Sequence, residues 1–198
     1  VIPSGMTIAS GRGRHGSLGA LIYSNTQRKV ALFEARSYVR ITGLRIQGPD
    51  VSEHPPCGCE DYDAIGIHAH EATDVEIDNN ELWAWPWVAV WSEAGFGTHV
   101  HHNHIHHNRR KLLNGHGTGY GVQADVGDTL IEANAFDHNR HDVASAGWPG
   151  TSYEARFNVS LRGGSEQSYD CHGGKDRDDG TNIACETVLI HHNTILQD

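Results

Sequence analysis

The segment THVHHNHI (98–105) contains a pattern that four other segments repeat. Each centres on an Asn, with Ile, Val or Ala three positions before it and, in four of the five, an apolar residue two positions after it. The other four segments are VEIDNNEL (75–82), TLIEANAF (129–136), YEARFNVS (153–160) and VLIHHNTI (188–195). The five Asn are 23, 31, 24 and 35 residues apart, and VRITGLRI (39–46) fits the same frame with Leu44 in the Asn place. Self-similarity at such intervals is typical of a solenoid.

Short strands of period two that recur every 23 to 36 residues cannot pair as hairpins. They are expected instead to stack in parallel, one repeat on the next, with the apolar column inside and the Asn side chains hydrogen-bonded in a ladder at the turn. About seven coils at a strand spacing of about 4.8 Å predict a rod on the order of 33 Å long. We expect residues 1–198 to form a single all-β domain that is truncated at both ends.

The composition agrees with an all-β chain and excludes two classes of partner. Among 198 residues, 37% are hydrophobic and 23 are Gly, which favours a turn-rich fold. The net charge of −10 has the wrong sign for holding a phosphate backbone, so we expect no nucleic acid partner. Since no apolar run approaches the roughly 18 residues of a spanning helix, we also expect no membrane insertion.

Four cysteines leave two interpretations open. An even number suits disulfides in an oxidising compartment, with three possible pairings of Cys57, Cys59, Cys171 and Cys185. The alternative is free, partly buried thiols. A zinc site fits less well, because the C-x₂-C spacing is missing.

The I-x-x-N-x-I pattern, the IHHN segments and the leading IPSGMTIASGRG (2–13) together resemble the pectate-lyase-like superfamily. The resemblance covers nearly the whole chain and implies a right-handed, single-stranded parallel β-helix of about seven coils with an Asn-containing turn ladder. Residues 137–195 also resemble uncharacterised secreted bacterial β-helix proteins, which implies a secreted or periplasmic location. The superfamily includes polysaccharide lyases, glycoside hydrolases, tailspikes and periplasmic metal-handling proteins, so the resemblance is specific for the fold and weak for the activity.

Outward columns follow from the alternation of side chains along a strand. Two positions before the Asn, the column includes Glu132, Arg156 and His191, which form either a polar ladder or a solvated face with weak ion pairs. A second strand in each repeat would place one outward column on a shallow floor, namely His68, Trp91, Gln123, Ala144 and His172. In proteins that this sequence resembles, the corresponding sheet commonly carries the saccharide cleft.

Aromatic and histidine-rich stretches each allow two interpretations. In WAWPWVAVW (83–91), Trp87 and Trp91 are candidates for stacking on a sugar ring, or they pack beneath a neighbouring loop. The stretch HVHHNHIHHN (99–108) is either surface histidine or a transition-metal site. Because a strand spreads its side chains along a line and the Asn turn divides the tract, it makes a poor cage on its own.

The densest polar group is YDCHGGKDRDDGTN (169–182). Its alternating Asp176, Asp178 and Asp179 around a Gly suggest a weak calcium site, although the closing Glu of an EF-hand loop is missing. The alternative is a solvated charged loop. Calcium is the one cofactor that the sequence suggests.

Two classes of function follow. A secreted enzyme acting on a polysaccharide would use β-elimination or hydrolysis. For elimination, Arg140 or Arg177 would clamp the uronate, His172 or Lys175 would be the base, and His141 or Tyr120 the acid. For hydrolysis, Asp142 and Asp170 are the candidate carboxylates. The expected substrate-binding residues are Tyr120, Gln123, Trp87, Trp91, Tyr153 and Glu154. The alternative is a non-enzymatic rod, such as a fibre, a tailspike-like stalk or a metal-handling periplasmic module, which would self-associate end to end or belong to a larger parent chain.

Overall fold

The computed structural model describes residues 1–26, 28–50, 63–109, 117–162 and 167–196. These residues form two β-sheets in which every strand pair is parallel. The helices of the described part are a short 3₁₀ turn, η1 (Arg14–Gly16), and one turn of helix, α1 (Gly174–Arg177). The expectation of an all-β chain with parallel strands is therefore confirmed. No helix within the described ranges has the length and apolar character needed to cross a bilayer.

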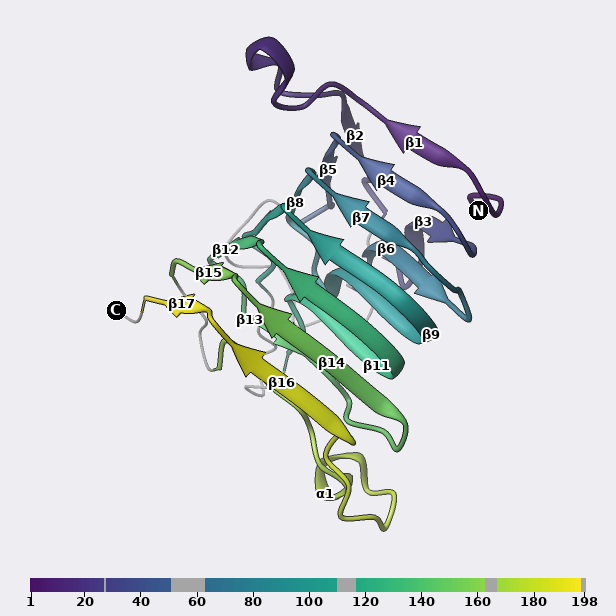
Figure 1. Cartoon of the computed structure of the whole chain (residues 1–198), viewed down its shortest axis with the longest axis vertical. Helices are drawn as coiled ribbons and strands as arrows, with labels where there is room; N and C mark the ends of the chain where they lie inside the picture. Colours follow the sequence, from purple (N-terminus) through teal and green to yellow (C-terminus); the bar gives the residue numbers. More distant parts are fainter. Residues whose placement is uncertain (27, 51–62, 110–116, 163–166, 197–198) are drawn as a thin grey trace.

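The ten-stranded sheet, called sheet A, has two halves joined by the long strands β9 and β11 (Figure 1). Its first half contains β3 (Ala31–Ala35), β6 (Ile65–His70), the beginnings of β9 (Val88–His101) and β11 (Tyr120–Glu132), and β13 (His141–Ala144). Its second half contains β1 (Thr7–Ala9), β4 (Arg40–Thr42), β7 (Glu76–Asp78), the ends of β9 and β11, β14 (Thr151–Arg156) and β16 (Thr187–His191).

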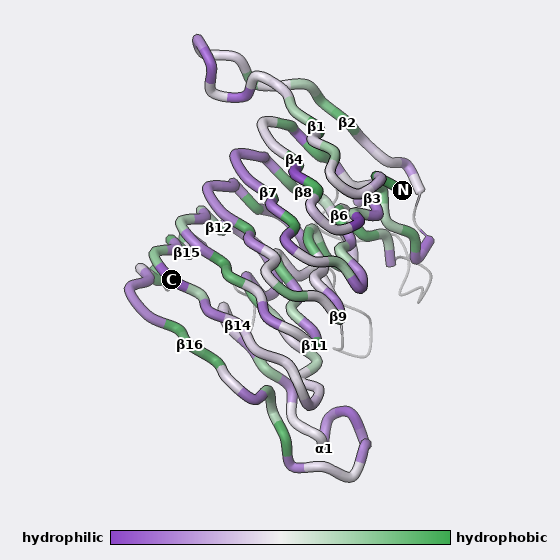
Figure 2. Tube along the Cα trace, turned by 45° about the vertical axis from the view of Figure 1, so that its right-hand side comes forward, coloured by the Kyte–Doolittle hydropathy of each residue, from purple (hydrophilic) through white to green (hydrophobic). Residues whose placement is uncertain are grey.

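The seven-stranded sheet, called sheet B, follows the second half of sheet A in each repeat. Its strands are β2 (Leu21–Tyr23), β5 (Arg45–Gln47), β8 (Glu81–Trp83), β10 (His104–His106), β12 (Ala135–Asp137), β15 (Val159–Ser160) and β17 (Thr194–Ile195). In this strand order, each repeat returns to the edge of the sheet and adds one more parallel strand there. Hydrophilic and hydrophobic stretches alternate along the repeats (Figure 2).

The register places the predicted apolar columns side by side. Ile41, Ile77, Val100, Ile131, Ala155 and Ile190 are successive partners in sheet A. Ile46, Leu82, Ile105, Phe136, Ser160 and Ile195 are successive partners in sheet B. Nearly all of these side chains are buried, and the exceptions are Ile190 and Ile195 in the last strand of each sheet. The apolar frame read from the sequence is the frame of the core.

Asparagine side chains hydrogen-bond from repeat to repeat between the two sheets. The Oδ1 of Asn103 accepts from the backbone N–H of Asn80 at 2.9 Å, and the Nδ2 of Asn103 donates to the carbonyl of Ile77 at 2.8 Å. Asn134, Asn158 and Asn193 continue the same bonds in the next repeats. Because these groups are buried, each side chain satisfies backbone groups that water does not reach.

Left-handed backbone in these turns falls on the residue before each Asn and not on the Asn itself. His102, which precedes Asn103, has a φ of 54°. His107 has a φ of 53° and belongs to a different turn later in the repeat. There, Asn108 and Asn139 form a second buried asparagine column that was not predicted from the sequence. The signal was present as a spacing of five between Asn103 and Asn108, and again between Asn134 and Asn139.

Candidate functional site

A pocket lies beside the first half of sheet A, where the loop that carries α1 meets the sheet. Its lining comes from three parts of the chain, namely Tyr120 and Gln123 of β11, Ala144 with Ser145 and Ala146 at the end of β13, and His172, Asp176 and Arg177 of the loop. Tyr120, Gln123, His172 and Arg177 were all expected near one another from the sequence. The pocket brings these four together.

The register of the floor agrees with the prediction except in its last strand. His68, Trp91, Gln123 and Ala144 are successive partners, as expected. At the next repeat Val143 pairs with Tyr169, and the N–H of His172 donates to the carbonyl of Ser145. The sequence predicted that His172 follows Ala144 in the column, but the bridge from Val143 to Tyr169 shifts the loop by two residues, so Asp170 follows Ala144 instead. This segment pairs with β13 through one isolated bridge and the backbone bonds around it, and it forms no strand of its own whose period-two pattern could have predicted the register.

His172 lies between two carboxylates. Its Nε2 is 2.9 Å from Oδ2 of Asp170, and its Nδ1 is 3.4 Å from Oδ2 of Asp176. The hydrogen bond that His172 donates to Asp170 raises the pKa of His172 above its ordinary value, and the same bond lowers the pKa of Asp170. With both ring nitrogens facing carboxylates, the protonated form of His172 is favoured relative to an isolated imidazole. The base role predicted for His172 fits this geometry less well than a role as an acid or as a cation that binds an anion.

His141 and Arg140 form the inner wall next to the pocket. The His141 ring stacks on Tyr120 at 5.4 Å, its Nδ1 is 2.7 Å from the carbonyl of Gln167, and its Nε2 is 2.9 Å from Nη1 of Arg140. A carbonyl only accepts and a guanidinium only donates, so Nδ1 of His141 carries the proton and Nε2 accepts. Both residues are at least nine-tenths buried, and they support the pocket from within.

Trp87 and Trp91 are half-buried and form a tilted pair with ring centroids 5.1 Å apart. Their indole N–H groups donate to Gln123 Oε1 and Asp125 Oδ2 respectively. His68 stacks on Trp91, and the ammonium of Lys29 lies 3.9 Å from the Trp87 ring centroid. The two indoles are therefore fixed in position next to Gln123 and form the aromatic edge of the pocket floor.

Asp125 is a buried residue that the sequence reasoning missed. Its two oxygens accept from Gln123, Trp91, Ser145 and the backbone N–H of Ala146 at distances of 2.6 to 3.2 Å. Burial raises its pKa above the ordinary value despite these bonds. The period-two alternation of β11 places Asp125 on the same face as Gln123, which is the signal that could have identified it. It anchors the pocket floor.

Arg177 has a structural role instead of the predicted one as a clamp for substrate. Its Nε donates to Asp179, and its two terminal nitrogens donate to the carbonyls of Ala146, His172 and Ile183 and to the Thr181 hydroxyl. These bonds use all five guanidinium N–H groups. Arg177 therefore ties the α1 loop to the end of β13, where the Cys171–Cys185 disulfide holds the same loop. Cys57 and Cys59 lie outside the described residues.

The three predicted calcium ligands do not share one centre. Asp179 is held by Arg177 and Thr181, Asp178 ends α1 in the left-handed region, and Asp176 faces His172. Lys175 is exposed on α1. Within the described ranges, two groups of three candidate ligands converge within 4.8 Å, and neither includes these aspartates. Calcium stays a prediction.

The proposed carboxylate pair for hydrolysis is not assembled. Asp142 is 2% exposed and accepts from Asn139 at 3.0 Å in the second asparagine column, and burial raises its pKa to about 6. Gly121, its register partner in β11, also faces inward, because a Cβ there would lie 3.0 Å from the Phe136 ring. Asp170, in contrast, faces His172 at the pocket. The period-two alternation of side chains does not hold at this point, because the successive residues Gly121 and Val122 of β11 are both buried.

Two predicted substrate-binding residues lie elsewhere. Tyr153 is 3% exposed and belongs to the apolar core, where burial raises its pKa. Glu154 pairs with Arg156 at 2.7 Å and with His191 at 3.1 Å in the second half of sheet A. Arg156 also contacts Glu132, so the predicted polar ladder exists, with Glu154 as the partner of His191.

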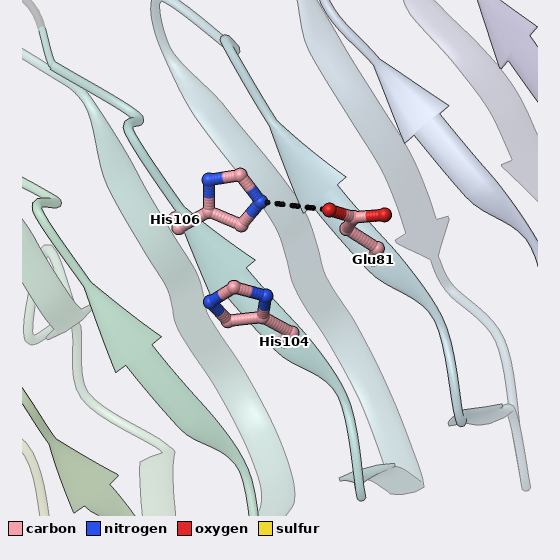
Figure 3. Close-up of side chains that lie close together, drawn as sticks. All are labelled: Glu81, His104 and His106. Carbon is pink, nitrogen blue, oxygen red and sulfur yellow. Dashed lines mark hydrogen bonds and ion pairs between the residues drawn. The ribbon is translucent and has the colours of Figure 1, made fainter. Parts of the chain in front are cut away.

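The histidine tract divides between the sheets at Asn103, as the sequence implied. His101 Nε2 lies 3.1 Å from Glu76 Oε1 in sheet A, and His106 Nε2 lies 3.3 Å from Glu81 Oε1 in sheet B (Figure 3). Burial lowers the pKa of His106 to about 4, so its imidazole is neutral at ordinary pH.

Comparison with known proteins does not identify a function for this site, because the chain matches no family model, no curated protein and no solved structure.

Proposed function

We propose that this chain is a right-handed parallel β-helix of the pectate-lyase-like type, with the asparagine column as its turn ladder. The in-register return of strands every 23 to 36 residues supports the proposal, as do the buried Asn bonds between successive repeats. The Cys171–Cys185 disulfide supports a secreted or periplasmic location, because disulfides persist in oxidising compartments.

We further propose that the protein acts on an acidic polysaccharide at the pocket beside His172. The observation that carries this proposal is the position of the His172 imidazole between Asp170 and Asp176, next to a floor of Tyr120 and Gln123. The adjoining indoles of Trp87 and Trp91 offer apolar ring surface to a sugar, and the cation offers a partner to a uronate carboxylate. A polysaccharide bound along the pocket floor would cross successive strands of the first half of sheet A.

In this proposal His172 donates a proton to the leaving glycosidic oxygen, a step that elimination and hydrolysis share. Elimination fits the site better, since Asp142 is buried away from Asp170 and the two carboxylates do not flank one bond. Lys175, one residue before Asp176 in α1, is the remaining candidate for the base that removes the proton next to the uronate carboxylate. Asp170 positions His172 and keeps it charged.

The test is a screen of the purified chain against uronate-containing and neutral polysaccharides, with and without calcium. Elimination produces an unsaturated sugar that absorbs near about 235 nm, whereas hydrolysis produces reducing ends without that absorbance. The His172→Gln variant should lower the rate at least about 100-fold, as expected for loss of a general acid. The His101→Ala variant, which removes an imidazole from the second half of sheet A, should keep the wild-type rate. Equal rates in wild type and His172→Gln would refute the assigned site.

A non-enzymatic rod is the second candidate, and one observation favours it. Arg177 in the pocket lining and Asp125, which bonds to Gln123 of the lining, are both engaged in bonds that hold the protein together. A rod that binds polysaccharide without cleaving it would show saturable binding that His172→Gln weakens, and no product by either readout. That result would keep the pocket as a binding site and remove the catalytic role.

A further inference from the structure

Three side chains that can bind a metal gather on the outer face of sheet B. Glu81 of β8 pairs in register with His104 of β10, and His106 Nε2 is 3.3 Å from Glu81 Oε1. Because Ile105 between the two histidines is fully buried, His104 and His106 leave the strand on the opposite face. Candidate ligand atoms of the three residues all lie within 4.8 Å of one another, and Figure 3 shows the two rings next to the carboxylate.

The donor set is that of a transition-metal site. Two imidazoles and one carboxylate bind zinc in catalytic sites and iron in the facial triad, and both leave positions open for water or a further ligand. In a tetrahedral zinc site the ligand atoms are about 3.4 Å apart, and the spacing of His106 Nε2 and Glu81 Oε1 already meets this value. We propose that Glu81, His104 and His106 bind a divalent transition-metal ion such as Zn²⁺.

Neighbouring groups hold the ligands in place. Arg45 Nε donates to Glu81 Oε2 at 2.7 Å, which leaves Oε1 directed at the histidines. On the far side of the His106 ring, Nδ1 lies 2.9 Å from Nδ1 of His107, so its N–H can donate there while Nε2 binds the metal. The indole of Trp83 stacks on His106 with an interplanar angle of 5°. Such outer contacts orient metal ligands and fix their tautomers.

A second cluster at the equivalent place in sheet A supplies the contrast. Glu76, Asp78 and His101 also converge within 4.8 Å. There, Arg40 donates to both oxygens of Asp78, at 2.8 and 2.9 Å, and Thr42 donates to one of them. That cluster offers one imidazole, and its two carboxylates, Glu76 and Asp78, share the guanidinium of Arg40. At Glu81, in contrast, Arg45 bonds to Oε2 while Oε1 faces His106, so we assign the metal to sheet B and an ion-pair network to sheet A.

The proposal is tested with untagged protein, because a polyhistidine tag would bind the same ions. Co²⁺ titration should give d–d absorption with a nitrogen and oxygen ligand pattern, and Zn²⁺ should displace Co²⁺ at one equivalent. The variants His104→Ala and Glu81→Gln should each weaken Co²⁺ binding at least about tenfold. His101→Ala is the matched control, since it removes an imidazole bonded to a glutamate in the same way, and it should bind Co²⁺ like the wild type.

Absence of Co²⁺ binding by the wild type would overturn the proposal, as would unchanged binding in both site variants. Circular dichroism checks that each variant is folded. Anomalous diffraction from wild-type crystals soaked in Co²⁺ does not depend on the variants. It should show a peak among His104, His106 and Glu81, and a peak only at another histidine would reject the site.

Discussion

The surroundings of two histidine–carboxylate pairs in this molecule shift the histidine pKa in opposite directions. His172 at the pocket faces Asp170 and Asp176, is 36% exposed, and has a raised pKa. His106 on sheet B faces Glu81, is 14% exposed, stacks on His104, and has a pKa lowered to about 4. Burial and a neighbouring imidazole disfavour the cation, whereas two carboxylates favour it. In our proposals, His172 binds an anionic sugar and His106 binds a metal ion, and the two pKa shifts fit these different roles.

The largest effect is expected from Asn103→Ala, which acts on the sheet B side of this comparison. Loss of the amide leaves the N–H of Asn80 and the carbonyl of Ile77 buried without their partner, at a cost of about 2–4 kcal/mol in the free energy of unfolding. Denaturant unfolding measures this cost. Because Asn103 directly precedes β10, metal binding at His104 should weaken as well. A variant as stable as the wild type would contradict the role given to the asparagine column.

Gly147→Ala should act on the pocket side alone. Gly147 has a φ of 69°, and a Cβ there would lie 1.9 Å from the carbonyl oxygen of His172. The substitution should cost about 1–3 kcal/mol for the strained backbone, and it should displace His172 from the pocket. Polysaccharide binding, measured by calorimetry, should be lost while Co²⁺ binding is kept. Loss of both would mean that the two sites are not independent.

The frame of the fold could be predicted from sequence, because a core column repeats the same chemistry in every repeat. Ile77, Val100 and Ile131 signal one another by their shared distance from an Asn. The pocket could not be predicted to the same degree. Its loop carries no repeat, so the alignment of Tyr169 with Val143 had no periodic signal. The hydrogen bonds that give Arg177 a structural role depend on carbonyls that a sequence pattern does not show.

The ion pairs beside the histidine tract could not be predicted from the sequence either. A run of histidines looks alike on both sides of Asn103, and each side has two imidazoles packed on one another. The sides differ in their cations, since Arg40 donates to both oxygens of Asp78 in sheet A and Arg45 donates to Oε2 of Glu81 in sheet B. Which arrangement forms is decided by residues in other repeats, 23 or more positions away.

Asp170→Asn should sharpen the comparison with a moderate effect. The amide cannot stabilise the imidazolium as a carboxylate does, so the pKa of His172 should fall, while that of His106 should not change. The stabilising contribution of the raised pKa is present below the ordinary value of 6.5 and is lost as pH rises through the folded value. The variant should therefore lose stability mainly at acidic pH, as measured by thermal unfolding across pH 5 to 8. An equal loss at every pH would assign the effect to packing.

The smallest effect is expected from His101→Ala. Its bond to Glu76 is a partly exposed pair, and such pairs contribute about 0–1 kcal/mol. Thermal unfolding and Co²⁺ titration should both resemble the wild type. A large drop in Co²⁺ affinity would move the metal site from sheet B to sheet A.

The charge difference between His172 and His106 is tested most directly by NMR titration of the histidine ring signals, assigned through the variants His172→Gln and His106→Gln. At pH 5.5 the account predicts a protonated His172 and a neutral His106, because one pKa lies above 6.5 and the other is about 4. The stability contributed by neutral His106 is present above 6.5 and lost as pH falls toward 4. If both imidazoles titrate together near 6.5, the two sites are not distinguished by charge and the account is contradicted.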